Sequence, residues 1–155
     1  MSPVYGRHEA MQLLSLIISL VSVLVAVVVA VWGFRSSSRS ERLRMFFDLQ
    51  ERYLSEPVRV GRRLIHTAIA GNDHVIITDI PRETLSSIGY TLAVMNTIAI
   101  CTEVGYVDEA LIARSMGRSF ATAVYAALPY IDHVESVRGF RPYPYAERFA
   151  ARLRA

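Results

Sequence analysis

The sequence predicts an all-α protein, with one N-terminal transmembrane helix followed by a small bundle of about four to five helices. Three observations support this class. The 22 residues of Leu13–Phe34 include no charged side chain. Most later segments repeat apolar residues every three or four positions, which is the helical period. Only one short stretch, His74–Ile80, has a strand-like composition.

The uncharged stretch is long enough to cross a membrane. As a helix it extends about 33 Å, and a bilayer core is about 30 Å thick. Its many valines would favour a strand in water, but within lipid a single segment satisfies its backbone groups only as a helix. A cleaved signal peptide has a basic start and a shorter apolar core. Residues 1–12 contain only Arg7 against Glu9, so we expect an uncleaved, single-pass anchor at residues 13–34.

The charges beside this span predict its orientation. Residues 35–44 form a basic juxtamembrane segment with four arginines against Glu41, a net charge of +3. The leading tail has no net charge when its histidine is neutral. Because positive loops stay on the cytoplasmic side, we expect the tail outside and the domain of residues 45–155 in the cytoplasm, at the cell inner (plasma) membrane. The residues expected at the membrane surface are Trp32, Phe34, Arg35, Arg39, Arg42 and Arg44.

Small side chains recur along one face of the span, at spacings of 4, 3, 4, 4 and 3. This small-residue stripe comprises Ser15, Ser19, Ser22, Ala26, Ala30 and Gly33. Small residues let two helix backbones approach closely in lipid. We therefore expect a packing face for another transmembrane helix, in a hetero-complex or a homo-oligomer. The alternative is a scatter of small residues due to composition alone.

The remaining elements follow from capping and periodicity. The helix ending at Leu54 either continues directly from the span or joins it through the serines of residues 36–38. Ser55 and Pro57 start a second helix that extends to about Ala70. We expect His74–Ile80 to be an extended connection. The third helix, Pro81–Glu103, is the most apolar of the domain and is expected at its centre.

The C-terminal third predicts two further helices. Asp108 caps the first, and Pro129 limits it after Leu128. We expect Tyr130–Pro144 to be irregular because of its prolines, and a last helix over Tyr145–Leu153.

No pattern for catalysis or cofactor binding is present. No histidine pairs with another ligand at metal-site spacing, and there is no glycine-rich phosphate loop or nucleophile elbow. We expect His66 to be a core or boundary histidine and Cys101 a small core residue. Glu103 is expected to pair with Arg114, Arg118 or Arg138 rather than to act as an acid with a raised pKa. The sequence therefore predicts no catalytic residue, no metal and no cofactor.

Two arginine groups are candidates for contact with lipid headgroups, or are simply solvated faces. They are Arg59, Arg62 and Arg63, and then Arg138, Arg141, Arg148, Arg152 and Arg154. After Arg44 the chain has twelve arginines and twelve acidic residues, so the domain is neutral overall. Binding to nucleic acid is therefore not expected.

Residues from about Asn96 to Leu153 resemble a family of uncharacterised bacterial membrane proteins. The matching features are Asn96, the run from Glu103 to Asp108, the region of Arg138, the pair Pro144–Tyr145, and Phe149. The resemblance implies a single span and a small helical domain, and it implies no activity, cofactor or catalytic residue.

Together these observations favour a membrane-anchored interaction module, an accessory or scaffold subunit of a larger membrane complex. The alternative is a membrane-tethered regulatory or sensor domain that binds a small ligand or a lipid headgroup. An enzyme is the third and least favoured class. The expected partners are the lipid bilayer and another transmembrane helix.

Overall fold

The computed structural model describes the backbone of residues 5–70 and 76–154, and the side chains of residues 16–30, 32, 40–70 and 76–154. It divides the chain into two units, residues 1–41 and 42–155. The described residues are helical and include no β-strand, which confirms the all-α class.

Helix α1 covers Tyr5–Leu54 and therefore includes the predicted span. The sequence left open whether the span and the first domain helix are continuous, and α1 is one uninterrupted helix. Within the domain, Phe46, Leu49 and Tyr53 of α1 are buried, at the three- and four-residue spacing of a helix face.

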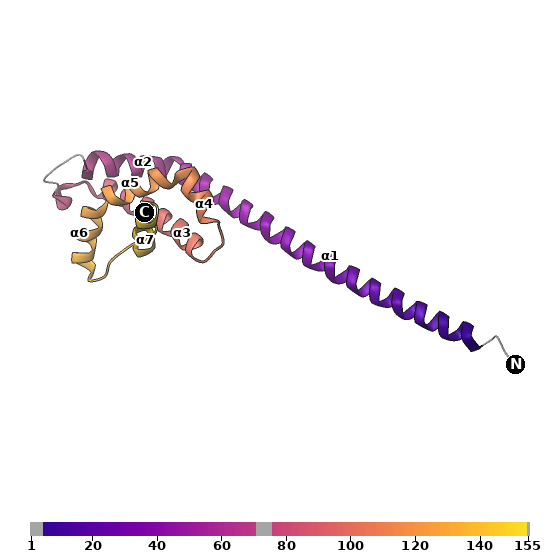
Figure 1. Cartoon of the computed structure of the whole chain (residues 1–155). Coiled ribbons are helices and arrows are strands. Elements are labelled where there is room, and N and C mark those ends of the chain that lie inside the picture. Colours follow the sequence, from indigo (N-terminus) through magenta and orange to yellow (C-terminus); the bar gives the residue numbers. More distant parts are fainter. Residues whose placement is uncertain (1–4, 71–75, 155) are drawn as a thin grey trace. The chain divides into compact units, whose positions relative to one another are not determined.

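The domain is built from shorter helices around α3, a helix of 22 residues (Figure 1). The elements are α2 (Glu56–Leu64), η1 (Ile65–Ala70), η2 (Ile77–Asp79), α3 (Arg82–Glu103), α4 (Glu109–Ile112), η3 (Ala113–Gly117), α5 (Arg118–Ala126), α6 (Leu128–Arg138) and α7 (Pro144–Arg152). The expected number of four to five helices is not confirmed, because the predicted fourth helix is divided into α4, η3 and α5.

Helix α3 occupies the centre of the domain, as expected. It contacts α2 on one side and α7 on another, and Ile88, Leu92, Met95 and Ile98 are fully buried along it. The close approach of α2 depends on Gly61, since a Cβ there would lie 1.9 Å from the Thr91 hydroxyl oxygen and 2.7 Å from the Ser87 carbonyl oxygen. Phe120 of α5 and Phe149 of α7 meet edge to face, with centroids 5.2 Å apart, and complete the core.

Two predictions for local structure were wrong. Residues Leu128–Arg138 form α6 instead of an irregular segment, because Pro129 lies in the first turn of this helix, where its missing N–H costs nothing. Gly139 then ends α6 in the left-handed conformation, with φ of 74°. The described part of the His74–Ile80 connection contains a 3₁₀ turn, Ile77–Asp79; His74 and Val75 lie outside the described residues.

One helix among the described residues, α3, is long and apolar enough to cross a membrane by length and composition alone. Its inward face is buried in the domain core, and it packs against α2 and α7. A core helix of a folded domain passes the same test. A shorter apolar run of described residues, Leu16–Ala30, lies in α1.

Candidate functional site

The predicted span and its flanks are only partly described. All fifteen residues of Leu16–Ala30 are exposed, as is Trp32. Arg42 and Arg44, at the start of the domain, are also exposed. The side chains of Phe34, Arg35 and Arg39 lie outside the described residues. Contact of these groups with a membrane surface therefore stays a prediction.

Four members of the small-residue stripe are described: Ser19, Ser22, Ala26 and Ala30 are all exposed. The Ser22 hydroxyl donates to the carbonyl oxygen of Ile18, 2.8 Å away in the preceding turn. That bond leaves the hydroxyl oxygen free to accept from another helix, and it keeps the side chain close to its own backbone. Ser15 and Gly33 lie outside the described side chains.

Helix α7 is attached to α3 by polar contacts at both ends. At its N-terminus, the side-chain oxygen of Asn96 accepts from the backbone N–H groups of Tyr145 and Ala146, each at 3.1 Å. Nearer its C-terminus, Arg148 donates to Glu103 at 3.1 Å. The expected partner of Glu103 was wrong, since Arg148 and Arg152 are the cations within 4.0 Å. The sequence could not identify them, because the pairing depends on how α7 packs on α3.

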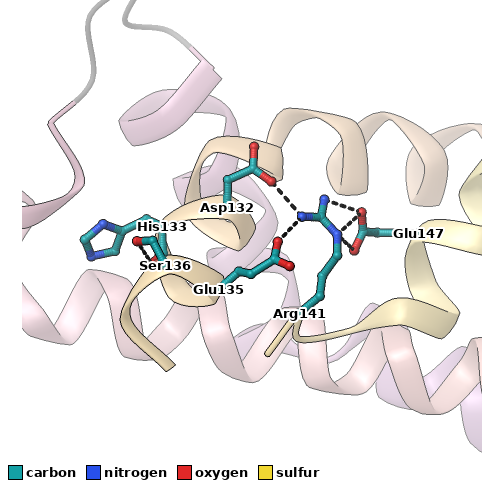
Figure 2. Close-up of polar contacts among 6 residues, drawn as sticks. All are labelled: Asp132, His133, Glu135, Ser136, Arg141 and Glu147. Atoms are coloured by element: carbon teal, nitrogen blue, oxygen red, sulfur yellow. Dashed lines mark hydrogen bonds and ion pairs between the residues drawn. The ribbon is translucent and has the colours of Figure 1, made fainter. Parts of the chain in front are cut away.

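Arg141 joins α6 to α7 through three carboxylates (Figure 2). It donates to Glu147 through Nε and through Nη2, at 2.9 and 2.7 Å. Its Nη1 donates to Asp132 at 2.9 Å and to Glu135 at 2.5 Å. These hydrogen bonds, led by the one to Glu147, raise the pKa of Arg141 above its ordinary value. The cluster has one cation for three anions, and it fixes the connection between the two helices.

A pocket of about 430 Å³ lies beside the two π-helical segments, η1 and η3. Its polar lining comprises His66, Arg114, Ser115, Arg118, Ser119 and Thr122. Single π-helical turns are frequent at functional sites, since the extra residue redirects neighbouring side chains. His66 is exposed and lines this pocket, so the expectation that it belongs to the core or its boundary was wrong.

Ser119, which lines this pocket, belongs to a hydrogen-bonded group from three helices. The Ser119 hydroxyl oxygen accepts from the Tyr53 hydroxyl at 3.0 Å and from Arg62 Nη1 at 2.8 Å. The Arg62 guanidinium stacks over the Tyr53 ring, 4.1 Å from its centroid. Within the described part of the chain, the buried Arg62 Nε has no hydrogen-bond partner. Arg62 thus brings a positive charge to Ser119, which is the member of this group that lines the pocket.

A second pocket, of about 290 Å³, lies between α3 and α6. Arg82, Tyr130, His133 and Arg138 line it together with apolar residues. Tyr130 and Tyr143 both approach Gly89, and the Tyr143 hydroxyl donates to the carbonyl oxygen of Gly89 at 3.2 Å. Burial raises the pKa of both phenols. Tyr143 also has a positive φ of 59°, which is uncommon for a side chain of its size.

Sequence reasoning missed both pockets, because each unites residues from segments far apart in the chain. A partial signal existed at Arg114 and Arg118, which are four residues apart and so share one helix face. Burial raises the pKa of the Cys101 thiol, which is half-buried against the core and not within it as expected. Among the described residues, no group of three or more histidine, cysteine and acidic side chains is placed to hold a metal ion.

Comparison with known proteins identifies the family. No curated protein and no solved structure matches this chain. Residues 20–153 match the family model described as a domain of unknown function, DUF4760. This confirms the expectation of an uncharacterised family, which the resemblance had suggested. The match covers every helix of the domain and most of the chain, and the chain therefore belongs to the DUF4760 family.

Proposed function

We propose that this protein is a single-pass, membrane-anchored interaction module, an accessory or scaffold subunit of a larger membrane complex. The observation that supports anchorage is the uninterrupted run of exposed residues in Leu16–Ala30, all apolar except for two serines. Runs of exposed apolar residues on this scale are unfavourable in water and favourable in lipid. Its position in α1, ahead of the domain, suits a tether.

The small-residue stripe is the proposed contact for a second transmembrane helix. Lipid tails are as apolar as valine, so an aligned small face gains nothing from lipid alone. Two helices that approach along it gain van der Waals contact, and serine hydrogen bonds contribute about 0.6 kcal/mol each on average. The partner is either another protein or a second copy.

A matched pair of variants tests this contact. Ser22→Leu with Ala26→Leu adds bulk at the middle of the stripe, whereas Val23→Leu with Val27→Leu adds bulk on other parts of the surface. In a membrane association assay at equal expression, the first pair should weaken association and the second should do much less. Equal effects would mean that the stripe is an accident of composition.

The proposed topology has the N-terminus outside and the domain in the cytoplasm, because the net charge is +3 after the span and zero before it. A reporter that functions only in the cytoplasm, fused after Ala155, should be active. An inactive but well-expressed fusion would contradict this orientation.

A second candidate is a membrane-tethered regulatory domain that binds a small ligand or a lipid headgroup. The pocket beside η1 and η3 favours it, because the polar side chains that line it belong to no ion pair in the described residues. Purification in mild detergent distinguishes the two candidates. A stable heteromeric complex supports the subunit, and a lone protein with an occupied pocket supports the regulator.

A further inference from the structure

The pocket beside η1 and η3 contains cations and hydroxyl groups without a balancing acid. Arg114 and Arg118 line it together with His66 of η1, and no carboxylate belongs to its lining. Every ion pair of the described residues lies elsewhere. Glu56 pairs with Arg59, and arginines of the C-terminal segment pair with the other five acidic residues of these pairs, which are Glu103, Glu109, Asp132, Glu135 and Glu147. Two guanidinium groups therefore face the same space with unused donors.

The hydroxyls of the lining have different capacities. Thr122 donates to the carbonyl oxygen of Arg118, and Ser115 to that of Ile112, so their hydrogens are already in use. Ser119 instead accepts two hydrogen bonds, from Tyr53 and from the charged Arg62, and donates to no described group. Accepting from a cation and from a phenol polarises this hydroxyl, which makes it a stronger donor to an anion.

This arrangement fits one class of ligand. A guanidinium offers a planar fork of N–H donors that matches phosphate and carboxylate oxygens. Two guanidinium groups, an imidazole and a serine hydroxyl together offer more hydrogen-bond donors than the two oxygens of one carboxylate readily accept. A terminal phosphate presents three acceptor oxygens and about two negative charges. A volume of about 430 Å³ also leaves room for a small organic group beside the phosphate.

We propose that the pocket formed by His66, Arg114, Arg118 and Ser119 binds the phosphate group of a phosphomonoester, with Arg62 and Tyr53 orienting Ser119 from behind. The phosphomonoester is either a soluble metabolite or a lipid headgroup such as phosphatidic acid. The proposal gives a ligand class to the regulatory candidate above. It does not depend on the small-residue stripe.

The experiment uses the full chain in nanodiscs of phosphatidylcholine. Isothermal titration with inorganic phosphate and with glycerol 3-phosphate tests the soluble source. Nanodiscs that contain phosphatidic acid test the lipid source, through the shift of the thermal unfolding midpoint relative to phosphatidylcholine alone. Binding in either arm supports the proposal and identifies the source, and absence of binding in both arms overturns it.

Matched variants locate the binding. Arg114→Gln with Arg118→Gln should weaken phosphate binding at least about tenfold, since each removes a charge-assisted hydrogen bond. Arg82→Gln with Arg138→Gln removes the same charge from the other pocket and should leave binding within about twofold. Arg114→Lys with Arg118→Lys keeps the charge without the planar fork, and should lose less phosphate affinity than the glutamine pair.

Folding and anchorage are controlled separately. Both arginines are exposed and make no described ion pair, so each variant should keep the wild-type circular dichroism spectrum. Equal loss in the Arg82 and Arg138 pair would overturn the assignment to this pocket. The phosphate titrations can also be carried out in detergent, without a bilayer. Membrane anchorage is tested separately by fractionation, so failure of one proposal is distinguishable from failure of the other.

Discussion

Asn96 provides the most direct test of how the domain is held together. Its side-chain oxygen accepts from two backbone N–H groups at the start of α7, at 3.1 Å each. Tyr143, which precedes this helix, has no side-chain hydrogen bond to the helix N-terminus. Asn96 thus caps α7 from a different helix, and its side chain links α3 to α7.

The expected cost of removing this cap follows from the two bonds. Loss of an ordinary N-cap costs about 0.5–2 kcal/mol. Because Asn96→Ala leaves two half-buried N–H groups without an acceptor, we expect the upper part of that range, about 2 kcal/mol. Asn96→Asp keeps the acceptor and adds a negative charge at a helix N-terminus, worth about 0.3–1 kcal/mol in the opposite direction. It should be neutral or slightly stabilising.

Thr97→Ala is the matched control. Thr97 is the next residue of α3, is exposed, and bonds only to the carbonyl oxygen of Ala93 in its own helix. Its removal should change the free energy of unfolding by less than about 0.5 kcal/mol. Urea unfolding of the full chain in detergent, followed by circular dichroism, measures all three variants. The capping account is refuted if Asn96→Ala matches Thr97→Ala, or if Asn96→Asp is as destabilising as Asn96→Ala.

Three further predictions concern charged and titratable groups. Arg141→Gln leaves three carboxylates without their shared cation, so it should destabilise the domain by about 0.5–1 kcal/mol, with a smaller effect in 1 M salt, as measured by urea unfolding; an effect independent of salt would argue against the cluster. Burial raises the pKa of Tyr130 and Tyr143 above the ordinary 10.0, so the folded state binds more protons than the unfolded state, and stability should fall as pH rises above about 10. Tyr143→Phe should flatten that pH dependence. An unchanged slope would contradict the assignment of the pH dependence to this buried phenol. The raised pKa of Cys101 lowers its thiolate fraction, so maleimide should label it more slowly in the folded chain at pH 7 than in urea; equal rates would show an accessible, reactive thiol.

The sequence allowed most of the helices to be predicted, because their signals are local. Asp108 does cap its helix, with its carboxylate accepting from the N–H of Ala110 at 2.8 Å, and Gly105 takes the left-handed conformation after α3. Pro129 was misinterpreted because a proline signals both the end of one helix and the first turn of the next. Here Ala127 alone lies between α5 and α6.

The polar sites were less predictable, because they depend on contacts between distant segments. Glu103 bonds to an arginine 45 residues away, and Ser119 unites groups from α1 and α2. The π-helical register of η1 and η3 also has no clear sequence signature, although it determines which side chains line the pocket. Periodicity predicts which face of a helix is buried, and it does not predict which other helix lies against it.

The central claim is that Leu13–Phe34 anchors the chain in a membrane. Alkaline carbonate extraction of membranes from expressing cells tests it directly, with Leu24→Arg combined with Val28→Arg as the control variant. Each central arginine costs about 2.5–3.5 kcal/mol on the insertion scale, whereas the domain of residues 42–155 is unaltered. We expect the wild-type chain to remain in the membrane pellet and the double-arginine variant to be released. Release of the wild-type chain into the supernatant would contradict the claim.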